Sequence, residues 1–299
     1  MISRTHLINW NWVRWLLMIL LLALPLCGHA QVVEFPNSTN SVKLRLYTDG
    51  APASAHLLNM FDLEAGGETL IQAPAAAVAR QGWLIDGRGP TLSQSNGLEI
   101  IERASGREWQ YLRLDGTRAY ADRLAEFKRG LLFVAPDLFV IHDHFISRKP
   151  VRLQACLHVP PGTIIDPVWK DLRYNSSNAW FRVCAPGKKN ELRAFTRLEP
   201  LPGSLQDDTV MELAPPNKSV TELDVLTVLV VGKTGEKRDY AFKLLESINA
   251  VGARIHRDGL PTLVAFRLNP SSTNSTLTGF PFDGPVGVDV FRPVKRLSH

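Results

Sequence analysis

The chain has 299 residues, 45% of them hydrophobic, which is enough for a sizeable core and makes a single domain the default expectation. Its 34 basic and 29 acidic residues are spread along the chain, without a run of five or six like charges. This pattern is typical of an ordinary solvated surface and gives no indication of a nucleic-acid partner. A weak preference for a polyanion is the alternative, and an acidic polysaccharide suits it better than nucleic acid does.

The first thirty residues have the pattern of a secretory signal peptide. Arg4 and Arg14 precede an apolar segment at 15–26, and small residues follow at positions 28 and 30. The apolar segment is too short to span a bilayer comfortably. We therefore expect cleavage after Ala30, export to the periplasm or the extracellular space, and no stable membrane span after cleavage. A lipoprotein attached through Cys27 and an uncleaved anchor are the alternatives.

Short apolar or alternating segments follow at intervals of roughly 8–12 residues, with turn residues between them. This spacing is typical of antiparallel strands, and no internal repeat or long helix interrupts it. A short helical turn is expected within 120–128. The strands predicted ahead of residue 115 are 42–47, the two arms of 56–71 on either side of a turn at 65–67, 83–86, 98–101 and 108–114.

The segment 115–160 organises the predicted sheet, because its apolar runs are short, rich in branched and aromatic residues, and bounded by turn residues. Runs of this kind favour neighbouring antiparallel strands in a sandwich. The predicted strands are 131–135, 138–141 and 151–159, with a Pro136-Asp137 turn after the first and a polar turn at 147–150 after the second.

The remaining chain continues the same pattern, and the segment 223–231 is apolar enough to be buried on both faces. Residues 240–248 are the best helix candidate, with a strand followed by a turn as an equal alternative. From about residue 269 the chain is rich in Ser, Thr, Pro and Gly, so an irregular tail is expected. Further strands are predicted at 181–184, 192–198, 210–213, 223–231, 254–257 and 262–268. The prediction is an all-β protein: one large antiparallel β-sandwich domain over 31–299, with few or no helices after the signal segment.

Several positions in this pattern resemble the C-terminal β-sheet domain of the heparinase II/III-like polysaccharide lyases. The similarity spans roughly residues 42–235, and no single motif in it is diagnostic. The matching features are Arg129, Pro136, Asp137, Asp143, Pro150 and His158 around the central strands, the segment Asp115–Tyr120, and the strand with its turn at Leu84–Gly89.

The resemblance implies β-elimination on uronic-acid sugars, in which a base removes the proton beside the carboxylate and an acid protonates the leaving oxygen. The family builds its site between this β-domain and a large N-terminal helical toroid. Only about a dozen residues separate the predicted signal peptide from the first predicted strand. We therefore expect the toroid, and the His, Asn, Tyr and Arg that it supplies, to be missing from this chain.

The catalytic candidates that the resemblance leaves are His56, His158, Tyr120 and Arg129. A satisfied strand-end residue is the structural alternative for His158, and packing is the alternative for Tyr120 and Arg129. In some relatives a His, an Asp and a later His bind a structural zinc. Here Ala73 replaces the Asp and no His lies within 73–90, so one ligand of three remains and no cofactor is expected.

His142 and His144 are a weak candidate metal pair. Alternate residues of a strand share one face, which suits a grip by two imidazoles, although a third ligand is not evident. In the alternative, this pair is incidental and Asp143 makes a structural hydrogen bond.

Two cysteines remain after the signal peptide, Cys156 and Cys184, each in an apolar strand-like segment. Export to an oxidising compartment permits a disulfide between them. Two buried free thiols are the equal alternative.

Three functions are consistent with these features. The first is an exported β-domain that binds or positions an acidic polysaccharide without cleaving it, beside a separate toroid-bearing lyase subunit. The second is an active polysaccharide lyase with a degenerate site. The third is a structural envelope protein.

Overall fold

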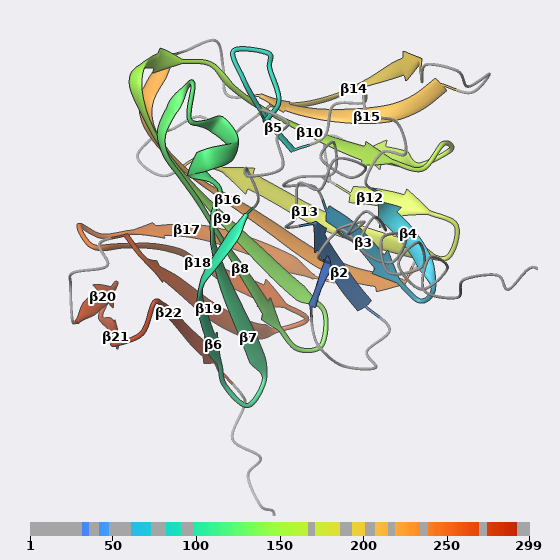
Figure 1. The fold of residues 1–299 in the computed structure, drawn as a ribbon. Helices are drawn as coiled ribbons and strands as arrows, with labels where there is room; N and C mark the ends of the chain where they lie inside the picture. Colours follow the sequence, from blue (N-terminus) through green and yellow to red (C-terminus); the bar gives the residue numbers. More distant parts are fainter. Residues whose placement is uncertain are drawn as a thin grey trace, which may run out of the picture.

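The structure of the protein is a computed structural model, and its described part consists almost entirely of antiparallel strands (Figure 1). No α-helix occurs in that part, which contains one short 3-10 helix, η2 (Thr117–Tyr120). The all-β prediction is therefore confirmed. The described residues are 32–35, 42–47, 61–72, 82–90, 98–166, 171–185, 193–200, 207–214, 219–233, 239–268 and 274–291.

An eight-stranded sheet forms the middle of the molecule. In spatial order its strands are β11 (Ile164–Asp166), β12 (Asp171–Tyr174), β13 (Ser177–Cys184), β16 (Val220–Lys233), β9 (Leu138–Val151), β8 (Leu124–Val134), β7 (Trp109–Asp115) and β6 (Glu99–Ser105). The long strands β8, β9 and β16 are rich in Val, Leu, Ile and Phe, whose side chains favour a pleated, buried surface. The β8–β9 hairpin reverses at the predicted Pro136-Asp137 turn, since Val134 pairs with Leu138.

Both faces of this sheet are covered by apolar cores. Along β9, Phe139, Ile141 and Phe145 enter the first core, whereas Leu138 and Val140 enter the second on the opposite face. Alternate strand residues point to opposite faces, so a strand between two cores is apolar at nearly every position.

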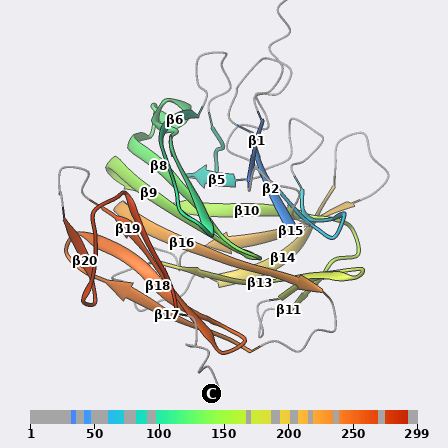
Figure 2. The ribbon, with the colours of Figure 1, turned by 90° about the horizontal axis from the view of Figure 1, so that it is seen from below.

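Two smaller sheets contribute to the first core, and one larger sheet covers the second. Figure 2 shows β17, β18 and β19 on one side of β16 and β9, and β5 and β10 on the other. The first-core sheets are β1 (Val32–Phe35), β2 (Val42–Tyr47), β3 (Phe61–Ala65), β4 (Glu68–Ile71), and β14 (Arg193–Pro200), β15 (Asp207–Ala214), β10 (Leu153–Val159), β5 (Gly82–Ile85). The second-core sheet is β17 (Tyr240–Glu246), β18 (Ala250–Arg257), β19 (Leu260–Arg267) and β22 (Val286–Val290).

The predicted polar turn at 147–150 is wrong, because β9 continues through it to Val151. The backbone is irregular at this point, and the register between β9 and β16 shifts at Val220 and Glu222. The Ser147 hydroxyl donates to the Lys149 carbonyl at 2.7 Å, so the polar residues that indicated a turn serve a local irregularity within one strand.

The helix candidate at 240–248 is also wrong, and its strand alternative is correct. Residues Tyr240–Glu246 form β17, which pairs along its whole length with β18. Half-buried and exposed positions alternate over its first five residues, which is the period of a strand at the edge of its sheet. Pairing with the neighbouring strand β18 therefore accounts for the strand conformation of this segment.

The predicted irregular tail contains three short strands. Val286–Val290 forms β22 and pairs with β19, while β20 (Ser275–Leu277) and β21 (Phe280–Phe282) form a small hairpin. These strands are only three to five residues long and are separated by turn residues, so the composition of the segment indicated an irregular tail. The helical turn expected within 120–128 is wrong, because the short helix η2 ends at Tyr120 and β8 begins at Leu124.

Within the described ranges, no helix is long and apolar enough to cross a membrane. The predicted signal peptide lies outside the described residues, and the single-domain boundary at 31–299 stays a prediction.

Candidate functional site

The interior of the first core contains a buried ion pair at two of the family-like positions. Arg129 on β8 lies directly opposite Asp143 on β9. Its Nε donates to Asp143 Oδ1 at 2.6 Å and its Nη2 donates to Oδ2 at 2.9 Å. The indole Nε1 of Trp83 donates to the same Oδ2 at 2.7 Å. All three side chains are almost fully buried, and Asp143 makes the structural hydrogen bonds that the sequence alternative expected.

Tyr120 joins this group through Trp83. Its hydroxyl donates to the backbone carbonyl of Trp83 at 3.0 Å, and its ring packs edge-on against Phe127. Tyr120 has 0% exposure, as expected for a side chain that seals the junction between η2 and β5. The neighbouring Arg123 donates to the carbonyls of Arg88 and Gly89, both at 2.7 Å, and so holds the turn after β5.

His158 lies on β10 and is also completely buried, with 0% exposure. Its backbone carbonyl accepts a hydrogen bond from Gln72 N at 3.0 Å, and its strand lies between β15 and β5. His56, the fourth catalytic candidate, lies outside the described residues. Tyr120 and Arg129 are thus gathered around Trp83 in the interior, and none of the described catalytic candidates reaches the surface.

His142 and His144 do share one face of β9, and Asp224 on β16 lies between them. His142 Nε2 is 2.8 Å and His144 Nδ1 is 2.9 Å from the same carboxylate oxygen, Asp224 Oδ1. The His142 ring also packs against Phe266 of β19. Among the described residues no group of three or more His, Cys, Asp or Glu side chains is arranged to hold a metal ion. Each of the two imidazoles instead lies at hydrogen-bond distance from the Asp224 carboxylate.

The shared carboxylate changes the acid–base properties of this cluster. Burial by itself lowers the pKa of His144, but the hydrogen bond and charge of Asp224, with the charges of Glu126 and Glu222, outweigh it and raise the pKa. Burial likewise tends to raise the pKa of Asp224, but the hydrogen bonds and charges of His142 and His144 hold that pKa well below its usual range.

Of the two equal alternatives for Cys156 and Cys184, the structure has the free thiols and not the disulfide. Both side chains are buried, but Cys156 lies on β10 and Cys184 on β13, in different sheets. The Cys184 thiol donates to the Leu226 carbonyl at 3.7 Å. The structure corresponds to the alternative of two buried thiols.

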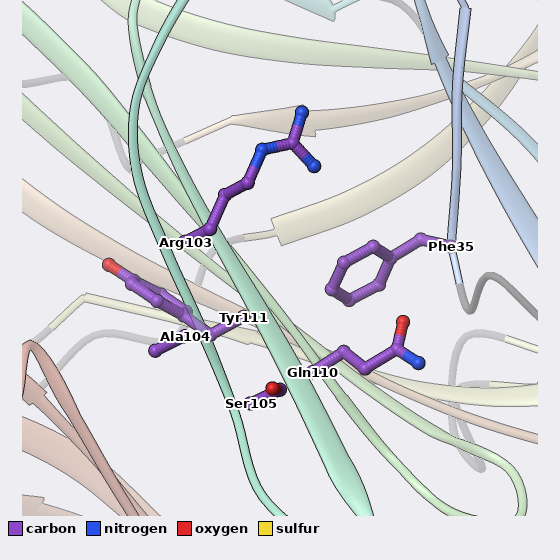
Figure 3. Close-up of a pocket in the computed structure, with 6 residues that line it drawn as sticks. All are labelled: Phe35, Arg103, Ala104, Ser105, Gln110 and Tyr111. Atoms are coloured by element: carbon purple, nitrogen blue, oxygen red, sulfur yellow. The ribbon is translucent and has the colours of Figure 1, made fainter.

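A surface pocket at the edge of the large sheet was not predicted from the sequence. It measures about 290 Å3 and lies between β1 and the β6–β7 hairpin (Figure 3). Its lining residues are Phe35, Arg103, Ala104, Ser105, Gln110 and Tyr111. Arg103 was the available signal in the sequence, but an isolated arginine resembles any solvated surface residue.

Comparison with known proteins identifies the fold. No model of a protein family and no curated protein sequence matches the chain. Among solved structures, the heparan sulfate lyase HepC from Pedobacter heparinus is similar over 81% of this chain and 41% of the lyase, with a TM-score of 0.59 and 11% identity. A heparinase III is similar over 79% of this chain and 41% of its own, with a TM-score of 0.58 and 13% identity.

A second heparinase III structure gives a TM-score of 0.56 at 11% identity, over 79% of this chain and 41% of that one. The chain therefore spans about two fifths of the length of the lyases that it resembles. At this identity the likeness establishes the architecture alone. The chain has the fold of the β-sandwich domain of heparinase III-type polysaccharide lyases.

Proposed function

We propose that this protein is an exported, heparinase-like β-domain that binds or positions an acidic, uronic-acid polysaccharide and does not cleave it alone. The fold supports the polysaccharide, because the similar structures are heparan sulfate lyases and heparinases. The burial of the catalytic candidates supports the absence of cleavage.

That burial carries the proposal. β-Elimination requires an acid and a base within hydrogen-bond reach of the sugar. Tyr120 and His158 have 0% exposure and Arg129 has 3%, so a polysaccharide on the surface contacts none of them. The Arg129 guanidinium is also directed at Asp143 in a two-pronged pair, which fixes its orientation away from a substrate.

The proposal includes a separate partner. In lyases of this resemblance the site lies between a helical toroid and the β-domain, so a toroid-bearing subunit on another chain would supply the acid and the base. Such a subunit should co-purify with this protein when both are produced in the same cell, and only the mixture should cleave a uronan.

Two measurements on the purified protein test the binding function. Electrophoresis through gels containing heparin, alginate or polygalacturonate should retard the protein relative to the same gel with neutral dextran. Incubation with the same polymers should produce no unsaturated uronate, detected by its ultraviolet absorbance. An absence of retardation in every acidic gel would favour the structural envelope protein.

The lyase alternative has a distinct outcome. Product formation by the protein alone, abolished in a His158→Ala variant that still unfolds cooperatively, would overturn the non-catalytic proposal. The cooperativity control is needed because His158 is completely buried, and its removal can affect folding as well as chemistry.

A further inference from the structure

The pocket between β1 and the β6–β7 hairpin contains a guanidinium on one face of the sheet. Arg103 and Ser105 on β6 lie opposite Leu112 and Gln110 on β7, so these four side chains share one face. Figure 3 shows the Arg103 and Gln110 side chains on the same side as Phe35 of β1, with Tyr111 and Ala104 toward the other side. The polar groups therefore lie beside an aromatic ring.

The charge of this pocket is positive. Arg103 is exposed and forms no ion pair with any residue that the structure describes. The adjacent Glu102 lies on the opposite face of β6, where it is 3.9 Å from Arg113. None of the lining residues is acidic. An anion entering the pocket would thus meet a cation without displacing a carboxylate.

The other lining groups suit a sugar. Ser105 is exposed and offers a hydroxyl at the rim, and the half-buried Gln110 side chain lies beside it on the paired strand. Phe35 is 7% exposed, so it presents an edge of apolar surface while it packs in the first core. The volume of about 290 Å3 is at the lower end of ligand pockets, which suits one sugar unit better than a longer segment.

We propose that this pocket is a subsite that holds the carboxylate or sulfate group of one sugar unit of the bound polysaccharide, with Arg103 as the anion-binding residue. This subsite rests on the proposed function, and it locates part of the polysaccharide-binding surface at the pocket between β1 and the β6–β7 hairpin. Guanidinium pairs with both groups through two parallel hydrogen bonds, because its planar fork matches two oxygens of either anion.

Calorimetric titration with two sets of defined oligosaccharides tests the subsite and separates its two anion sources. One set carries sulfate and carboxylate groups (heparin tetrasaccharide), and the other carries carboxylates alone (oligomannuronate of equal length). Arg103→Ala should weaken binding about 10- to 100-fold, the effect expected for a lost charge-assisted hydrogen bond. Loss in both sets assigns the carboxylate as the anion held, and loss only with heparin assigns sulfate.

Arg254→Ala is the matched control. Arg254 is an exposed arginine on β18, in the sheet that covers the opposite core, so the variant removes the same charge at a distant place. Its affinity should stay within about twofold of the unmodified protein, since remote exposed charges contribute little. Arg103→Lys keeps the charge but loses the fork, and it should bind more weakly than the unmodified protein.

The two proposals fail differently. If the unmodified protein binds but Arg103→Ala binds as well as Arg254→Ala, this pocket is not the subsite and the proposed function stands. If the unmodified protein binds neither oligosaccharide nor any acidic polymer, the proposed function fails and the subsite with it. Arg103 is exposed, so its variants should fold as the unmodified protein does, which melting curves will verify.

Discussion

Arg129 and Asp143 lie directly across from each other on β8 and β9 and form a two-pronged ion pair inside the first core. Trp83 donates to the same carboxylate from β5, in a different sheet. The buried charges therefore neutralise each other, and the hydrogen bond from Trp83 connects the pair to a second sheet. Positions that resemble a lyase motif serve here as an interior polar junction.

Removing one partner of this pair should be costly. Asp143→Ala leaves the Arg129 guanidinium buried without its carboxylate, and we expect a loss of about 3–5 kcal/mol in the free energy of unfolding. Chemical denaturation measures this loss. Asp122→Ala, which breaks the exposed Asp122–Arg123 contact, should cost about 1 kcal/mol or less. Equal losses in the two variants would contradict a structural role for the buried pair.

Tyr120→Phe tests the hydroxyl that binds Trp83. The variant keeps the ring but removes a buried donor, so the Trp83 carbonyl is left without it and stability should fall by about 1–3 kcal/mol. Tyr174→Phe is the control, because no hydrogen bond of the Tyr174 hydroxyl occurs in the described part of the chain. Polysaccharide affinity should stay unchanged in both variants, and a selective loss of affinity in Tyr120→Phe would place Tyr120 at the binding surface.

The His142–Asp224–His144 cluster should make stability depend on pH. The raised pKa of His144 means that its contribution is complete below the usual value of about 6.5 and is lost as the pH rises through the folded pKa. The lowered pKa of Asp224 means that its contribution is complete above about 3.8 and is lost as the pH falls through the folded pKa. The cluster should stabilise most between about pH 4 and 6.5.

The variant Asp224→Asn measures this window. The difference in unfolding free energy between the unmodified protein and Asp224→Asn should be largest below about pH 6.5 and should decrease as the pH rises through the raised folded pKa of His144. In a His144→Gln background the same substitution should show a weaker pH dependence. A difference that is constant from about pH 5 to 9 would contradict a raised pKa of His144 in the folded protein.

The cysteines give a chemical test of the sheet arrangement. Cys156 and Cys184 are buried in different sheets, so a protein consisting of residues 31–299, which lacks Cys27, should show no reactive thiol while folded and two after denaturation without a reductant. A reagent that absorbs on reaction with thiols counts them. No reactive thiol after denaturation would restore the disulfide that the structure excludes, and addition of a reductant would then release both.

The local pattern of the chain was enough to predict most of the strands. The alternation in 42–47 predicted β2 with its actual bounds, and the apolar runs on either side of Pro136-Asp137 predicted the end of β8 and the start of β9. The period of two also placed His142 and His144 on one face. These features depend on near neighbours in the chain, which the sequence displays directly.

What each residue touches was decided by pairing and layering, which local sequence does not encode. Asp224 reaches the two histidines because β16 pairs with β9 in one register, across about eighty residues of chain. Tyr240–Glu246 became a strand because β18 offered a partner edge. Tyr120, Arg129 and His158 are interior residues because additional sheets are packed around them. The exposure of a side chain depends on this packing, which the local sequence does not show.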